Sequence, residues 1–273
     1  MLAIVILVGL VVGLSLGALG GGGSILAVPA LVYLFGQDPR AATTSSLLIV
    51  GATSLIGMVP HQRAGRVSLA KGLVFGILGV AGSFVGSLLS TSVPQNVLLA
   101  SFSVLILVVA ALMTRRRRGQ ARAARAGLPA DADSTAPVIS VRPRFACDCP
   151  RAAKVVLTAS AVGLLTGFFG VGGGFAVVPA LVLALGLPMP LAVGTSLVVI
   201  AINSFTALLF RVGQAATLDW GVIGAFTLAA VVGSLLGSRV VSRVRPSRLD
   251  LAFTVLLVAV ALYTAARSFP ALF

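Results

Sequence analysis

The sequence predicts an all-α fold: a polytopic membrane bundle of two inverted repeats, each with a short helix broken by glycine. Three observations predict it. Of the 273 residues, 58% are hydrophobic and 10% are charged, which leaves too little polar surface to cover a water-soluble globule. A glycine-rich segment occurs twice, about 150 positions apart. The basic residues lie between apolar runs, and they are distributed differently in the two halves.

The duplicated segment consists of an apolar run, a glycine break and a short apolar run that contains proline. Residues 13–36 read GLSLGALGGGGSILAVPALVYLFG, and residues 163–186 read GLLTGFFGVGGGFAVVPALVLALG. The matched positions are Gly20, Gly22, Gly23 and Pro29 in the first half and Gly170, Gly172, Gly173 and Pro179 in the second. Glycine-interrupted segments at corresponding positions of two apolar halves are typical of the substrate site of a secondary transporter.

Each half contains five apolar segments. The third, fourth and fifth of each half reach the roughly 20 residues that a helix needs to cross a bilayer. Each second segment is shorter and contains proline, so we expect a half-helix or part of a re-entrant hairpin. Helices are expected because unpaired peptide groups in lipid are costly, and the continuous runs do not fit barrel strands. The segments cover 2–19, 24–36, 41–60, 68–91 and 95–114, then 154–170, 174–187, 191–210, 217–240 and 247–266.

The chain divides into a first transmembrane repeat (1–114), a basic linker (115–153) and a second transmembrane repeat (154–273). The linker begins with the four arginines 115–118, lacks apolar periodicity and is expected to be disordered. The positive-inside rule places it in the cytoplasm, although a role of its arginines in binding RNA or anionic lipid stays open. Cys147 and Cys149 are expected to be free thiols, because two thiolates alone make an incomplete zinc site.

Basic residues in the other loops predict the inversion of the repeats. In the first half they lie between the third and fourth segments, whereas in the second half they concentrate between the fourth and fifth. Equivalent loops therefore face opposite sides of the membrane if basic loops are cytoplasmic, and both termini lie outside. The residues concerned are Arg63, Arg66 and Lys71 in the first half, and Arg211, then Arg239, Arg243, Arg245 and Arg248, in the second.

Two inverted glycine breaks bring the N-termini of two short helices towards one central point. Glycine allows close backbone approach, and a helix N-terminus offers unpaired amides and about half a positive charge. Hydroxyl and amide groups nearby can complete an anion site. The alternative, that the glycines only let helices pack or kink, stays open. The candidate substrate-binding residues are Gly20, Gly22, Gly23, Ser24, Pro29, Thr44, Ser45, Ser46, Gly170, Gly172, Gly173, Gly174, Pro179, Gly194, Thr195, Ser196 and Asn203.

The rarity of titratable residues argues against other classes of protein. The chain has no glutamate, and none of its six aspartates lies within an apolar run, which argues against a metal or cation carrier. No metal site or cofactor is expected. The only histidine, His61, is expected in a solvated loop, and no catalytic constellation suggests an enzyme. An anion channel remains the alternative to an anion carrier.

The sequence resembles the sulfite exporter TauE/SafE family of bacterial membrane proteins. The resemblance lies in the duplicated glycine-rich segment followed by Pro-Ala-Leu, in Ala-Val-Gly-Thr-Ser-Leu at 192–197, and in the basic linker between two apolar halves. It implies a secondary transporter in the bacterial inner membrane, whose partners are the bilayer and a small anion, often sulfur-containing, such as sulfite or a sulfonate. The first half departs from the pattern with Thr-Thr-Ser-Ser at 43–46. Whether the protein is a homo-oligomer stays open.

Overall fold

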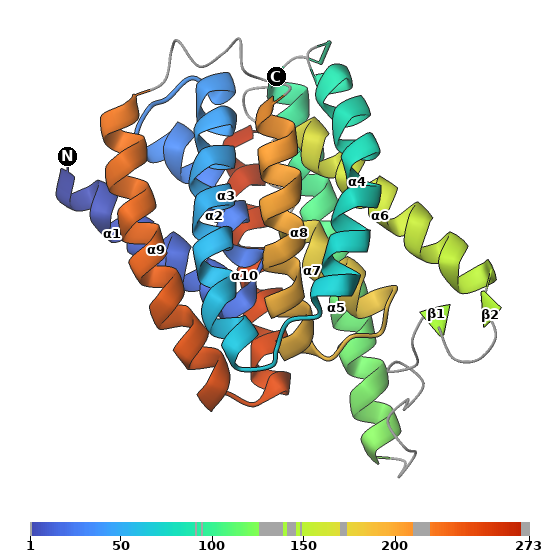
Figure 1. Ribbon diagram of the computed structural model, residues 1–273. Helices are drawn as coiled ribbons and strands as arrows, with labels where there is room; N and C mark the ends of the chain where they lie inside the picture. Colours follow the sequence, from blue (N-terminus) through green and yellow to red (C-terminus); the bar gives the residue numbers. More distant parts are fainter. Residues whose placement is uncertain are drawn as a thin grey trace.

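The computed structural model of the protein is an assembly of helices (Figure 1). It describes residues 2–90, 92–93, 95–125, 139–140, 146–147, 149–169, 174–209 and 219–268. The first half contains α1 (Leu2–Leu19), α2 (Gly22–Pro29), the π-helix η1 (Ala30–Leu34), α3 (Pro39–Arg63), α4 (Leu69–Ser90) and α5 (Gln95–Arg125). The second contains α6 (Cys149–Phe169), α7 (Gly174–Leu183), α8 (Met189–Leu209), α9 (Trp220–Arg243) and α10 (Pro246–Ser268). The all-α prediction is confirmed.

Aspartate caps begin two of the long helices. The Asp38 carboxylate accepts the backbone N–H of Arg40 at 3.0 Å, and Pro39 follows the cap, where its missing N–H costs nothing. The Asp219 carboxylate accepts the N–H of Gly221 at 3.0 Å at the start of α9. Both caps pair amides that the first helical turn leaves without an intrahelical partner.

The short second segment of the first half is divided in two. The helix α2 ends at Pro29, and the wider turns of η1 follow directly. Proline has no N–H to donate, and its ring excludes the carbonyl one turn earlier, so the regular hydrogen-bond ladder is disturbed there. Together α2 and η1 cover Gly22–Leu34, too short for a comfortable crossing of a bilayer.

The two halves exchange their first helices. The helix α1 packs along α9 of the other half, and α6 packs along α4 in the same way. A Cβ on Gly13 would strike the Ala230 carbonyl, and one on Gly163 would strike the Gly79 carbonyl. Small residues allow these backbones to approach closely, as in many membrane helix pairs.

Equivalent helices of the two halves run in opposite directions. Along the contact between α3 and α8, a Cβ on Gly51 would lie 3.2 Å from Ser204 and one on Gly57 would lie 4.0 Å from Leu197, so the two helices are antiparallel. Figure 1 shows the same relation: α3 ends at the lower end of the bundle, where the connection to α4 lies, whereas α8 ends at the upper end. The pairs α1 with α6 and α4 with α9 are opposed as well.

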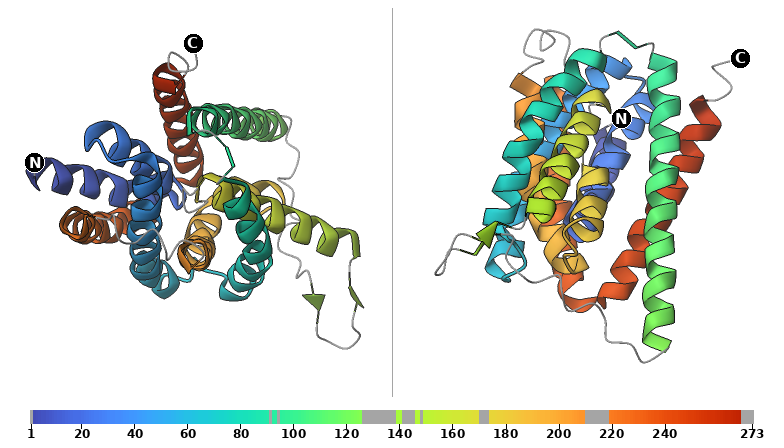
Figure 2. Two further views of the ribbon diagram at one scale, coloured as in Figure 1. Left: turned by 90° about the horizontal axis from the view of Figure 1, so that it is seen from above. Right: turned by 90° about the vertical axis from the view of Figure 1, so that its right-hand side faces the viewer.

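The outer surface suits a lipid environment. Six of the described helices are long and apolar enough to cross a membrane, namely α1, α3, α4, α8, α9 and α10. Their outward faces carry exposed large side chains, for example Ile77 (64% exposed) and Leu228 (72% exposed). The helices α5 and α10 lie side by side along one edge (Figure 2). The chain is therefore a multi-pass membrane protein.

Basic side chains gather at one end of the bundle. We call this the basic end; it lies at the bottom of Figure 1, where α3 meets α4 and α9 meets α10. The other end, where α9 begins, is called the acidic end because it carries Asp38 and Asp219. The basic end is formed by Arg63, Arg66, Lys71, Arg239, Arg243, Arg245 and Arg248.

Two details differ from the sequence-based expectation. The helix α5 continues through Arg125 and α6 begins at Cys149, so both ends of the segment expected as a disordered linker are helical. Inside it, strands β1 (Ile139–Ser140) and β2 (Ala146–Cys147) pair antiparallel, and the rest of the linker lies outside the described residues. In α9, a Cβ on Gly224 would meet nothing within 4 Å, so no neighbouring helix requires glycine at this position.

Candidate functional site

The first glycine break separates α1 from α2. Gly20 has a φ of +68°, a left-handed conformation that side chains disfavour. A Cβ at this position would overlap the Ser196 hydroxyl and would lie 3.0 Å from a methyl group of Val178. A side chain at position 20 is therefore excluded both by the left-handed backbone conformation and by the close approach of α7 and α8. Gly21 caps α2 without any side-chain hydrogen bond, so the first amides of this helix have no capping side chain.

The start of α7 meets the first break inside the bundle. Gly170, Gly172 and Gly173 lie outside the described residues. The helix α7 begins at Gly174, where a Cβ would lie 2.9 Å from the Cα of Gly21 and against the Ser24 hydroxyl. Ser24 and Gly174 occupy the same position of the two repeats, so equivalent points of the two repeats touch each other. The contact lies beside Ile200, near the middle of α8.

Not every predicted site residue faces this meeting point. A Cβ on Gly22 would lie 2.8 Å from Leu256 of α10, and one on Gly23 would strike the Val12 carbonyl of α1. These two glycines serve helix packing, the alternative that the sequence left open. Pro29 and Pro179 lie inside the two short helices, five residues beyond the contact between Ser24 and Gly174.

Three of the predicted hydroxyl donors bond to their own helix. Ser24 Oγ donates to the Gly21 carbonyl at 2.8 Å, and Ser196 Oγ donates to the Val193 carbonyl at 2.7 Å. Thr44 Oγ1 donates to the Arg40 carbonyl at 3.1 Å. Such local bonds are common for serine and threonine in membrane helices, so these hydroxyls must exchange a partner before they can donate to a ligand.

A second group of polar side chains is buried without a partner. Among the described residues, the hydroxyls of Ser45 and Ser46 on α3 make no hydrogen bond, and both residues are fully buried. The same holds for Thr53 and Ser54 two turns further along α3, and for Asn203 and Ser204, which match them on α8. A buried polar group without a partner costs about 1–3 kcal/mol. The helices α3 and α8, which pack together at the centre, therefore offer several donors to a bound ligand.

The side-chain amide of Asn203 lies against α4. The ideal Cβ position of Gly79 on α4 lies 3.1 Å from its Oδ1 and 3.4 Å from its Nδ2. Asn203 therefore lies where α8 meets α4, and the space for its amide depends on the glycine opposite. The site residues predicted from sequence contain Asn203 but not Thr53, Ser54 or Ser204, although their equivalence across the repeats marks all four as matching polar positions.

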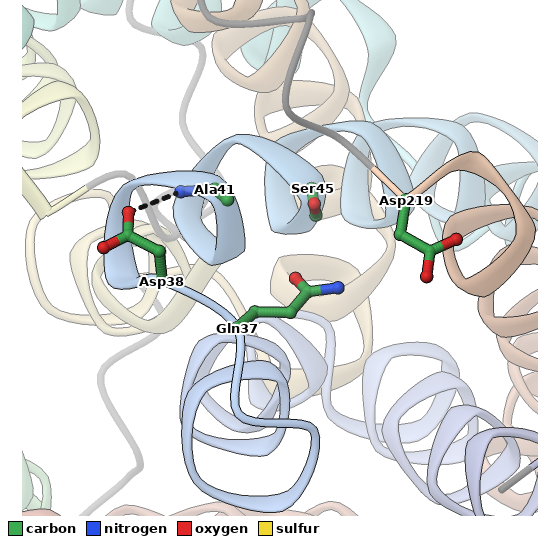
Figure 3. A pocket seen from close by; sticks show the side chains of 5 residues that line it. All are labelled: Gln37, Asp38, Ala41, Ser45 and Asp219. Carbon is green, nitrogen blue, oxygen red and sulfur yellow. Dashed lines mark hydrogen bonds between the residues drawn. The ribbon is translucent and has the colours of Figure 1, made fainter.

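A pocket of about 330 Å³ reaches α3 from the acidic end (Figure 3). Its lining residues are Gln37, Asp38, Ala41, Ser45 and Asp219. Asp38 and Asp219 are exposed at its mouth, and both carboxylates accept backbone amides as helix caps. The pocket thus extends from the surface to Ser45, whose unpartnered hydroxyl is itself fully buried.

The equivalent position at the basic end is covered. Thr195 matches Ser45, and its Oγ1 accepts the backbone N–H of Ser68 at 3.0 Å. A Cβ on the neighbouring Gly194 would strike the Arg66 carbonyl. The connection between α3 and α4 therefore lies directly on the start of α8 and covers Thr195, which is fully buried.

His61 is not a solvated loop residue, contrary to the expectation from sequence. It is fully buried near the end of α3, and its Nε2 lies 2.9 Å from the Gly17 carbonyl of α1. The close approach of α1 and α9 at Gly17 brings this carbonyl within reach. His61 thus links α3 to α1.

Among the described residues no group of three His, Cys, Asp or Glu side chains could hold a metal ion.

A multi-pass helical bundle in which the starts of two short helices meet in the interior is typical of membrane transporters. Residues 5–264 match the family described as "Sulfite exporter TauE/SafE". The chain belongs to this family and is a membrane transporter, with a small-molecule substrate and a lipid environment.

Curated relatives agree with this assignment. A "Probable membrane transporter protein" of Xylella fastidiosa (strain 9a5c) is 31% identical over 265 residues, covering 96% of this chain and 94% of the relative. The "Probable membrane transporter protein YunE" of Bacillus subtilis (strain 168) is 30% identical over 213 residues, covering 74% of this chain and 75% of the relative. No solved structure matches this chain significantly.

Proposed function

We propose that the protein carries a small anion across the bacterial inner membrane and binds it where the two glycine breaks meet. The family name favours a sulfur oxyanion, such as sulfite or a sulfonate. The single observation that carries the proposal is the contact between Gly174 and Gly21, which brings the starts of α2 and α7 together in the interior. Each helix start contributes about half a positive charge and unpaired amides.

The unpartnered hydroxyls on α3 supply a second, independent argument. An anion that leaves water must have its lost hydrogen bonds replaced. Ser45 and Ser46 are buried donors without a partner, and serine hydroxyls suit an oxyanion. Neutral donors and helix dipoles attract an anion without binding it as tightly as a buried lysine or arginine would, which favours release on the other side.

The direction of the helices and the positions of the charges support an inverted-repeat arrangement in the membrane. The opposed directions of equivalent helices fit halves related by a twofold axis in the membrane plane, and the basic end suits the cytoplasmic face. The linker is then cytoplasmic and both chain termini lie outside. In this orientation the pocket that leads to Ser45 opens to the outside.

The unequal ends favour a carrier over a channel. The outer pocket reaches Ser45, whereas its equivalent Thr195 is covered by the connection between α3 and α4 through the bond from Ser68. A carrier exposes its site to one side at a time, and inverted repeats can exchange the two arrangements. We propose that the structure corresponds to the outward-facing state of the carrier. When the site opens to the cytoplasm, the hydrogen bond from Ser68 to Thr195 must break.

Purified protein in lipid vesicles tests the proposal. We expect saturable uptake of radiolabelled sulfite or a sulfonate, and accelerated uptake when the same anion is loaded inside. Ohmic single-channel currents would favour a channel instead. A parallel melting-temperature screen in detergent against sulfite, sulfate, thiosulfate, sulfoacetate, carboxylates and divalent metals identifies the ligand class, because a ligand that binds the folded state raises the melting temperature. Stabilisation by metals alone would refute an anion carrier.

A further inference from the structure

Another pocket lies at the basic end of the bundle. A groove of about 610 Å³ runs between α3 and α9 towards the basic end. It lies beyond the point where Gly57 meets the Ser234 side chain and the two helices are close together. We call it the α3–α9 groove; its lining residues are Ile56, Val59, Pro60, Arg63, Ala64, Leu235, Ser238 and Arg239.

The groove changes character along its length. Its inner part is apolar and open to the surrounding lipid: Ile56 is 44% exposed, Val59 is 40% exposed and Leu235 is half-buried. Its outer part carries the exposed guanidinium groups of Arg63 and Arg239. From residue 56 to residue 64 the helix α3 rises about 12 Å, so apolar and basic parts are separated along the membrane normal.

This arrangement matches one membrane component. We infer that the α3–α9 groove binds an anionic phospholipid, with an acyl chain along Ile56 and Val59 and the phosphate between Arg63 and Arg239. Basic pockets between membrane helices at the cytoplasmic face suit anionic headgroups, and arginine can bind a phosphate through two parallel hydrogen bonds. The inference does not depend on the transported substrate.

The charge balance within the groove favours an anion. No lining residue is acidic, and neither arginine has a salt bridge among the described residues. The C-terminal ends of α3 and α9 each contribute about half a negative charge, which the two full positive charges more than offset. A zwitterionic lipid would gain less, because its own cationic group would be repelled by the same arginines.

The test is native mass spectrometry of the full-length protein released from detergent in the presence of phosphatidylglycerol or phosphatidylcholine. We expect one phosphatidylglycerol to be retained preferentially. Each arginine near a membrane surface contributes about fivefold to the binding of anionic lipid, so the double variant Arg63→Gln/Arg239→Gln should bind it roughly 25-fold more weakly. The matched control is Arg245→Gln/Arg248→Gln, which removes the same charge from the same end but outside the groove.

A second pair of variants tests the apolar part without changing charge. Ile56→Trp fills the groove and should weaken phosphatidylglycerol binding, whereas Leu55→Trp, at an exposed neighbour outside the lining (48% exposed), should not. Equal loss in the groove and control variants would overturn the inference in favour of diffuse surface charge. Equal retention of both lipids would overturn it too, as would competition by inorganic phosphate at the same concentration, since that result would indicate a site for the free anion.

Discussion

Removing the hydroxyl of Ser46 should raise the stability of the ligand-free protein and weaken anion binding. The side chain is fully buried on α3, and its Oγ has no hydrogen-bond partner among the described residues. A buried polar group in this condition costs about 1–3 kcal/mol. Ser46→Ala should therefore stabilise the protein without ligand, which is the reverse of what most buried substitutions do.

The same substitution should weaken anion binding. A hydrogen bond to a charged group contributes about 1.5–3 kcal/mol, so loss of one donor lowers the affinity roughly tenfold to a hundredfold. The melting temperature moves by about 2–4 °C per kcal/mol for a chain of about this size. We expect the ligand-free melting temperature of Ser46→Ala to rise by a few degrees, while the shift caused by the stabilising anion shrinks.

The assay is a thermal titration in detergent with the anion identified by the screen, and the control is Ser83→Ala. Ser83 is also fully buried, but its Oγ donates to the Gly163 carbonyl at 3.0 Å in the contact between α4 and α6. Its loss should lower the melting temperature and leave the response to the anion intact. If Ser46→Ala destabilises the ligand-free protein, its hydroxyl has a partner; if the anion response is unchanged, Ser46 does not contact the substrate. Either result refutes the reasoning.

Three further predictions concern the breaks, the inner connection and the topology. Gly20→Ala places a side chain on a left-handed backbone and against α8, so it should cost about 1–2 kcal/mol of stability or more and lower the melting temperature. The control Gly224→Ala has open space at its Cβ and should not lower the melting temperature. Thr195→Val removes the acceptor of the Ser68 amide, a hydrogen bond that contributes about 1 kcal/mol. Hydrogen exchange at the Ser68 amide should therefore accelerate about fivefold. Unchanged exchange would show that this bond does not hold the connection between α3 and α4 in place. A cysteine introduced by Ser242→Cys should resist an impermeant thiol reagent in intact cells and react after permeabilisation; labelling in intact cells would contradict the proposed orientation.

The fold was largely predictable because peptide groups inside a bilayer must be paired within helices or closed barrels. Apolar length and loop charge predicted the helices with small errors at their ends: the segment expected at 68–91 is observed as Leu69–Ser90. The continuation of α5 through Arg125 was missed because basic residues are good helix formers as well as markers of cytoplasmic loops. The exchange of α1 and α6 between the halves was not predicted, although glycines four residues apart, such as Gly9, Gly13 and Gly17, were its signal.

The approach of the two repeats was predictable, but the details of the candidate site were less so. The duplicated glycines indicated the break after α1, where Gly20 adopts a positive φ, and the observed contact of Ser24 with Gly174 agrees with the expected approach. The predicted second break, at 170–173, lies outside the described residues. Sequence alone could not separate glycines that shape the meeting point from those that face a neighbouring helix, as Gly22 and Gly23 do. Nor could it distinguish the self-bonded hydroxyl of Ser196 from the unpartnered one of Ser46, because local rotamers decide that difference.

The exchange of first helices has a consequence for synthesis in the cell. The helix α1 leaves the ribosome early, yet the helix on which it packs begins at Trp220, roughly 200 residues later. At a synthesis rate of about 5–20 residues per second, the glycine-lined face of α1 remains without its partner α9 for some 10–40 s. During that interval the membrane insertion machinery or lipid must cover this face, so a nascent chain stalled before α9 should be an early target for quality-control proteases.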